Sequence, residues 1–206
     1  MKDYEDLSRK HFNKQAKVYD ETDTTYYSKE GKISCKDIAS YLKNNEFKNL
    51  LDVGCGTGYL IEILSKEKEA DYHGLDLSEE MIKVAKSKDI PNSTFIRGTA
   101  DNLPYKDNTF DIVCCSQSFH HYPYQEKAIK EAYRVLKPNG LYILSDTGVG
   151  GILAWFDNHI IFPLLNSGDY KTTDKEGIAK MMEKENFTVI EKKQIKRFLY
   201  TVVGKK

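Results

Sequence analysis

The residues whose types and spacing point most directly to chemistry form a glycine-rich turn in the first third of the chain. An apolar run with one carboxylate, residues 50–53, is followed by Gly54, Gly56 and Gly58 and then by a helical pattern. This order predicts a buried strand, a tight turn and a helix start. Glycine suits a backbone that lies against a ligand, and a helix start offers unpaired N–H groups. We therefore expect a ligand site where this strand ends.

The positions of the glycines and of Asp52 restrict which class of ligand the turn could bind. A dinucleotide fingerprint, G-x-G-x-x-G, would require a glycine at Tyr59, but the third glycine comes one residue earlier. Asp52 beside the turn would repel a pyrophosphate and attract an ammonium or sulfonium group. The turn therefore favours a cofactor that carries a positive charge. An NAD(P)-dependent oxidoreductase is the disfavoured alternative.

An acidic residue ends the second predicted strand, residues 72–77. Asp76 lies 22 residues after Gly54 (76 − 54), where a carboxylate can accept hydrogen bonds from two ribose hydroxyls. Ser78 is expected to cap the next helix. Leu77 and Met81 are expected to bracket an adenine ring, and core packing is the alternative for Met81.

Two adjacent histidines follow the predicted strand 110–115. His120 and His121 have a reference pKa near neutrality, so either is a candidate general base or hydrogen-bonding partner of a nucleophile. A packing or capping role is the alternative. The remaining histidines are scattered, and the four cysteines show no metal-ligand spacing. No metal site is therefore predicted.

Three segments resemble motifs of the class I S-adenosylmethionine-dependent methyltransferases, and the chain is similar to the group that includes ubiquinone and menaquinone biosynthesis methyltransferases. Residues 52–58 match D-x-G-x-G-x-G, residues 100–104 match A-D-x-L-P, and residues 134–141 resemble R-V-L-K-P-G-G, with Asn139 replacing the first glycine. Asparagine tolerates the left-handed backbone, so this last turn is expected to persist. The resemblance implies S-adenosyl-L-methionine as the cofactor and S-adenosyl-L-homocysteine as the product.

The resemblance also implies roles for single residues. The Ala100 backbone and the Asp101 carboxylate would meet the adenine, and the strand end at Ser116 and Gln117 would contact the methionine amine. Residues 12–20 are similar to a lid motif, F-x-x-x-A-x-x-Y-D, so residues 1–30 are predicted to form a lid; a surface helix is the alternative. The predicted cofactor-binding residues are Tyr19, Asp52, Gly54, Cys55, Gly56, Gly58, Asp76, Leu77, Met81, Ala100, Asp101, Ser116 and Gln117.

Aromatic residues indicate where the molecule that accepts the methyl group would bind. We expect Phe119, Tyr122, Trp155 and Phe156 to enclose a small-molecule acceptor above the methyl group. The chain has 31 basic and 31 acidic side chains, so no overall basic field indicates nucleic acid. The apolar stretch 148–165 is interrupted by three polar residues, which argues against a membrane span.

The elements that must position these residues predict an α/β fold. We expect one methyltransferase domain, residues 1–206, with a Rossmann-like doubly wound sheet in the order 3-2-1-4-5-7-6 and an antiparallel last strand. Helices are expected over 7–19, 34–44, 125–136 and 172–185, and a variable substrate-side insertion over 147–186. Reduced cysteines indicate a cytoplasmic protein. A monomer or homodimer is expected, and a non-catalytic partner or sensor that binds the cofactor remains an alternative.

Overall fold

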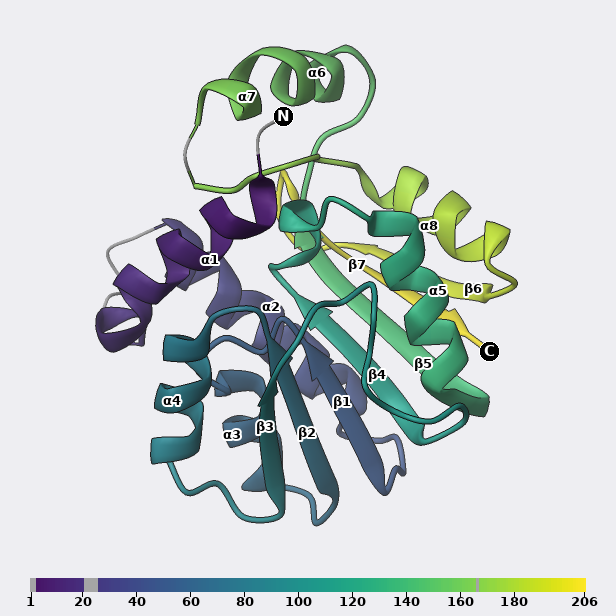
Figure 1. Cartoon of the computed structure of the whole chain (residues 1–206). Coiled ribbons are helices and arrows are strands. Elements are labelled where there is room, and N and C mark those ends of the chain that lie inside the picture. Colours follow the sequence, from purple (N-terminus) through teal and green to yellow (C-terminus); the bar gives the residue numbers. More distant parts are fainter. Residues whose placement is uncertain (1–2, 21–25, 166) are drawn as a thin grey trace.

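The strands form one sheet with the predicted order. The computed structural model describes residues 3–20, 26–165 and 167–206, and within them seven strands follow the order β3-β2-β1-β4-β5-β7-β6 (Figure 1). β1 to β5 run parallel, and β7 is antiparallel to both of its neighbours, as predicted. The strands are β1 (Asn49–Val53), β2 (Asp71–Asp76), β3 (Ser93–Arg97), β4 (Phe110–Ser116), β5 (Leu136–Thr147), β6 (Thr188–Gln194) and β7 (Leu199–Lys205).

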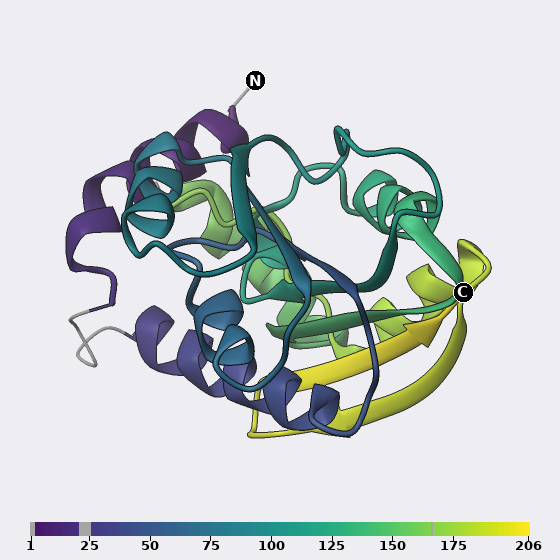
Figure 2. The ribbon, with the colours of Figure 1, turned by 90° about the horizontal axis from the view of Figure 1, so that it is seen from below.

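Helices cover both faces of the sheet. The helices α2 (Tyr26–Leu42), α3 (Tyr59–Ser65) and α4 (Glu79–Ser87) bury apolar side chains against one face, and α5 (Gln125–Val135) and α8 (Lys175–Lys184) cover the other. Figure 2 shows α2 and α5 on opposite sides. Successive strand residues point to opposite faces, so the neighbours Cys114 and Cys115 belong to different core clusters. Because helices pack on both faces of the sheet, the turn that follows β1 lies between two helical layers.

Side-chain caps begin two of the helices beside the ligand site. Ser78 Oγ accepts a hydrogen bond from the Met81 backbone N–H at 3.1 Å, as the sequence predicted, and starts α4. Asp3 caps α1 (Tyr4–Gln15) in the same way, through the Asp6 N–H at 3.0 Å. A short 3₁₀ turn (Ala16–Val18) continues α1 toward residue 20. These caps fix where α1 and α4 begin beside the site.

Two elements are longer than predicted. α2 begins at Tyr26 rather than near residue 34, so Tyr26 lies in a helix and not in a loop. β5 begins at Leu136 rather than Leu141, because Leu136 already pairs with Phe110 before the register shifts. Asn139, inside that irregular region, adopts a φ of 67°, which agrees with the left-handed backbone expected there.

The segment between β5 and α8 contains short helices that the sequence did not predict. α6 (Gly151–Phe156), a π-helical turn (Asp157–Ile161) and α7 (Phe162–Leu164) follow one another beyond the carboxyl end of the sheet (Figure 1). Their apolar side chains are largely exposed. Within the described ranges, none of the helices is both long and apolar enough to cross a membrane.

Candidate cofactor and acceptor site

A cavity opens at the carboxyl ends of β1, β2 and β4, where the sequence predicted a ligand. Its volume is about 1150 Å³ with the open space at its mouth included. Of the predicted cofactor residues, Gly58 does not line it. Those that do are Tyr19, Asp52, Gly54, Cys55, Gly56, Asp76, Leu77, Met81, Ala100, Asp101, Ser116 and Gln117.

The glycines of the turn serve different needs. Gly54 has a φ of 74°, and a Cβ there would lie 2.2 Å from Ser118 Oγ, so the turn packs tightly against the end of β4. Gly56 has a φ of 53°, and a Cβ there would meet no protein atom within 4 Å, because the residue borders the cavity. Gly58 instead lets α3 approach Phe95 of β3. A ligand can therefore lie directly on the backbone at Gly56.

Asp76 ties β2 to the glycine turn. Its Oδ2 accepts a hydrogen bond from the Gly56 N–H and its Oδ1 from the Ser78 N–H, both at 2.8 Å. Burial raises the pKa of this carboxyl, and the backbone N–H groups oppose that shift. Each oxygen keeps a second lone pair, so the side chain can still accept hydrogen bonds from a ligand in the cavity.

Asp52 is a buried carboxylate with one oxygen that has no hydrogen-bond partner among the described residues. The residue is 2% exposed, it lines the cavity, and its Oδ1 makes no hydrogen bond to the described residues. Burial raises its pKa to about 7, and the nearby Asp76 adds to the shift. An ionised carboxylate without a partner is costly in such a place. A positively charged ligand group would relieve that cost.

The N-terminal helix closes one side of the cavity. Phe12 and Tyr19 line it, and Asp20 Oδ1 accepts a hydrogen bond from Thr57 Oγ1 of the glycine turn at 2.6 Å. Asn13 Oδ1 accepts from Ser78 Oγ at 2.6 Å. The described part of the predicted lid, residues 3–20 and 26–30, thus includes direct contacts to the turn and to α4. Residues 1–2 and 21–25 of that prediction lie outside the described residues.

The predicted acceptor residues separate into two groups. His121 and Tyr122 line the cavity, whereas Phe119 is 1% exposed and packs in the core. Trp155 and Phe156 lie on α6, are 56% and 47% exposed, and do not line the cavity. The chain turns away from the sheet after β5, which carries both aromatic rings beyond the cavity.

Comparison with known proteins agrees with this geometry. Residues 51–144 match the family described as methyltransferase domain. This match covers less than half of the chain, and together with the relatives described below it supports a class I S-adenosylmethionine-dependent methyltransferase. S-adenosylmethionine is accordingly the cofactor that the cavity must fit. The unpartnered Asp52 oxygen suits its positive charge, the open face of Gly56 allows close approach, and Asp76 can accept from its hydroxyls.

Several curated methyltransferases resemble the chain over part of its length. An uncharacterised methyltransferase, YcgJ of Bacillus subtilis, is 34% identical over 134 residues, 61% of this chain and 53% of the relative. The demethylmenaquinone methyltransferase of Listeria welshimeri is 35% identical over 126 residues, 58% and 53% of the two chains. A phthiotriol/phenolphthiotriol dimycocerosates methyltransferase of Mycobacterium tuberculosis is 37% identical over 111 residues, 52% and 41%. The chain thus spans about half the length of these relatives.

Solved structures share the fold over most of the chain. A methyltransferase from Haloferax volcanii, described in complex with the Trm112 methyltransferase activator, has a TM-score of 0.78 and 19% identity, with 96% of both chains covered. The Bacillus subtilis YcgJ structure has a TM-score of 0.72 and 21% identity, with 85% of this chain and 98% of that chain covered. At these identities the likeness concerns the fold.

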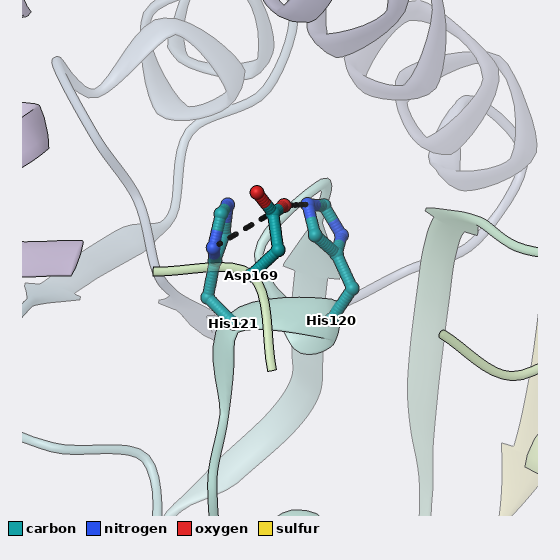
Figure 3. Close-up of side chains that lie close together, drawn as sticks. All are labelled: His120, His121 and Asp169. Carbon is teal, nitrogen blue, oxygen red and sulfur yellow. Dashed lines mark ion pairs between the residues drawn. The ribbon is translucent and has the colours of Figure 1, made fainter. Parts of the chain in front are cut away.

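The second predicted histidine has a neighbour that no sequence motif singled out. Asp169 Oδ1 lies 3.6 Å from His120 Nε2 and 3.8 Å from His121 Nδ1 (Figure 3). His120 Nδ1 is 2.6 Å from Asp146 Oδ1. Burial and the adjacent His120 lower the pKa of His121 to about 4; burial also opposes a charge on His120, but Asp146 raises the pKa of that ring. Asp146 and Asp169 come from distant segments, so no local spacing could have revealed this cluster.

Proposed function

We propose that the chain transfers a methyl group from S-adenosylmethionine to a small-molecule acceptor with an apolar body. The observation that carries this proposal is one cavity with two unlike ends. Two carboxylates, the buried Asp52 and the half-buried Asp76, lie at one end, and aromatic and histidine side chains line the other. Such a division suits a charged cofactor beside a less polar acceptor.

The residues of the chain would mainly align the two reactants and exclude water. The bound cofactor supplies a methyl group already activated by its sulfonium. Asp52 would hold the positive end, Asp76 the ribose, and Asp101 the adenine amino group. The bond between Asn13 of α1 and Ser78 of α4, and the bond between Asp20 and Thr57 of the glycine turn, would keep Phe12 and Tyr19 over the reacting centre. Alignment and removal of water account for much of the rate in such a reaction.

The character of the acceptor follows from the lining of the cavity. Phe12, Tyr19, Tyr122 and Tyr124 contribute aromatic surface, and His121 adds a polar group between them. Relatives whose names refer to demethylmenaquinone and to phthiotriol or phenolphthiotriol dimycocerosates support an acceptor with a large apolar part. The balanced net charge also favours a small molecule over nucleic acid.

A pair of measurements tests the proposal. Isothermal titration should show tighter binding of S-adenosylhomocysteine than of NAD. Purified protein given S-adenosylmethionine and a panel of quinols, phenols and aliphatic alcohols should release S-adenosylhomocysteine with at least one acceptor class. Tighter binding of NAD would refute the cofactor assignment. Firm cofactor binding with no transfer to any acceptor, crude metabolite extracts included, would instead favour the non-catalytic partner or sensor.

A further inference from the structure

A second arrangement of reactive groups lies beneath α1, between the end of β4 and the loop 167–171. His120 and His121 lie in the 3₁₀ turn after β4 (Phe119–His121), and Asp169 faces both rings (Figure 3). The three residues are 6%, 6% and 4% exposed. The Tyr170 and Lys171 N–H groups donate to the His120 carbonyl at 3.0 and 3.1 Å, so the two segments are tied together by backbone. The cluster is therefore held in place from both sides.

The hydrogen bonds of Asp146 define the state of the His120 ring. Asp146 Oδ2 accepts from the His120 N–H at 2.9 Å, and Oδ1 accepts from the Thr147 N–H at 2.7 Å. A carboxylate engaged in this way is an acceptor, so His120 Nδ1, 2.6 Å away, carries the hydrogen of their bond. In its neutral form the ring then presents the Nε2 lone pair to Asp169. A carboxylate that orients a histidine through Nδ1 is the usual support of a metal-bound imidazole.

Asp169 also presents a lone pair to that gap. Ser167 Oγ donates to its Oδ2, which leaves Oδ1 to face the two rings. The separations from Oδ1 to the histidine nitrogens, 3.6 and 3.8 Å, are too long for hydrogen bonds. Two ligand atoms on one tetrahedral metal ion would be roughly 3.3–3.6 Å apart. These two separations are longer than a direct hydrogen bond and close to the spacing of two ligands on a shared cation.

His121 is buried, and its ring nitrogens lack the hydrogen bonds that a buried polar side chain normally makes. Both ring nitrogens are buried and make no hydrogen bond of normal geometry to the described residues, although the Gly168 backbone is nearby. Phe12 packs against the ring, with 5.1 Å between ring centroids. Burial of an unpaired polar group costs free energy unless something satisfies it. A metal ion among the three side chains would do so.

We propose that His120 Nε2, His121 Nδ1 and the Asp169 carboxylate bind one divalent transition-metal ion, with Asp146 orienting His120. The ligand atoms lie within 4.8 Å of one another. Two imidazoles and one carboxylate suit Zn²⁺, Fe²⁺, Co²⁺ or Ni²⁺, whereas Mg²⁺ and Ca²⁺ prefer sites made of oxygen alone. His121 also lines the ligand cavity, so the ion would have one side toward it. That an acceptor oxygen or nitrogen binds there rests on the proposed function; metal binding itself does not.

Cobalt provides the most direct test, because Co²⁺ bound by nitrogen and oxygen ligands absorbs visible light. Untagged full-length protein would be treated with chelator, dialysed and titrated with Co²⁺ and then Zn²⁺. We expect about one ion per chain, with Zn²⁺ displacing the cobalt absorption. His121→Ala and the nearly isosteric Asp169→Asn should each weaken binding more than tenfold, and Asp146→Asn about 10–100-fold, the range for an orienting partner.

The matched control is His159→Ala, which removes an exposed histidine that stacks on Trp155, away from the cluster. Metal affinity should not change. Titration with S-adenosylhomocysteine on every variant separates loss of the metal from loss of the fold, and it also separates this proposal from the proposed function. Absence of cobalt absorption in the native protein would overturn the proposal and leave a proton-sharing histidine pair. Equal affinity in the native, His121→Ala and Asp169→Asn proteins would place the ion elsewhere and overturn it as well.

Discussion

The two ends of the cavity are built in different ways. The cofactor end comes from the turns that directly follow β1, β2 and β3, and each contributes a short motif to the wall. The acceptor end combines α1, α2 and the end of β4, with residues more than 100 positions apart in the chain. In the first region local sequence therefore predicts the contacts, and in the second the tertiary structure decides them.

Phe119 and Trp155 show this difference within one prediction. Both were expected to enclose the acceptor, yet one is 1% exposed and the other 56% exposed. Aromatic character indicates that a side chain seeks an apolar neighbour, but it does not indicate which one. Phe119 finds its neighbours in the core above α5, and Trp155 stacks on His159 at the surface.

The largest effect should come from Phe119. Replacement by alanine is expected to lower the free energy of unfolding by about 3–5 kcal/mol, because it leaves a cavity in the core. Urea denaturation measures this change. Phe119→Leu, which conserves more volume, should cost less than about 1.5 kcal/mol. A stable Phe119→Ala protein with impaired turnover would mean that Phe119 contributes to the acceptor site rather than to the core.

The next largest effect should come from Asp76, the residue predicted to bind the ribose of the cofactor. Asp76→Ala should weaken binding of S-adenosylhomocysteine by roughly 1.5–3 kcal/mol, the scale of hydrogen bonds to a charged acceptor. Isothermal titration measures it. Asp71→Ala, at the exposed start of the same strand, is the control and should bind normally. An unchanged dissociation constant in Asp76→Ala would mean that this side chain serves only the turn through Gly56 and Ser78.

Asp52 should make cofactor binding depend on pH. Its folded pKa of about 7 lies above the reference value of 3.8, so without ligand the carboxyl stabilises the fold below pH 4 and loses this contribution as pH rises to about 7. A cationic ligand prefers the ionised form. Affinity for S-adenosylmethionine should therefore fall as pH drops below about 7, by at most tenfold (about 1.4 kcal/mol) per pH unit.

Two controls isolate this effect. Asp52→Asn should bind S-adenosylmethionine more weakly at pH 8 and with a much flatter pH profile. Adenosine, which lacks the ammonium and sulfonium groups, should bind native protein with little pH dependence over the same range. The same slope in Asp52→Asn would assign the titration to another group, of which Asp76 is the nearest candidate.

Sequence reasoning predicted the sheet order, the glycine turn and most of the cavity lining at the cofactor end. It succeeded there because glycines, a capping serine and strand-end acids act on residues close to them in the chain. It missed Asp146 and Asp169, which reach His120 and His121 only through the packing of β5 and the loop 167–171. It also assigned Gly58 to the ligand, although the neighbour that requires this glycine is Phe95.

The smallest effect should come from Trp155. Because its side chain is 56% exposed on α6, Trp155→Ala should change the free energy of unfolding by no more than about 0.5 kcal/mol, and cofactor affinity should stay the same. Turnover is the informative measurement, since the sequence placed Trp155 among the residues expected to enclose the acceptor. Phe156→Ala, from the adjacent position, is the matched comparison. Normal turnover in both variants would separate α6 from catalysis. A drop in turnover with unchanged stability and cofactor affinity would mean that α6 contacts the acceptor. The acceptor site would then extend beyond the cavity to a segment that the sequence had correctly indicated.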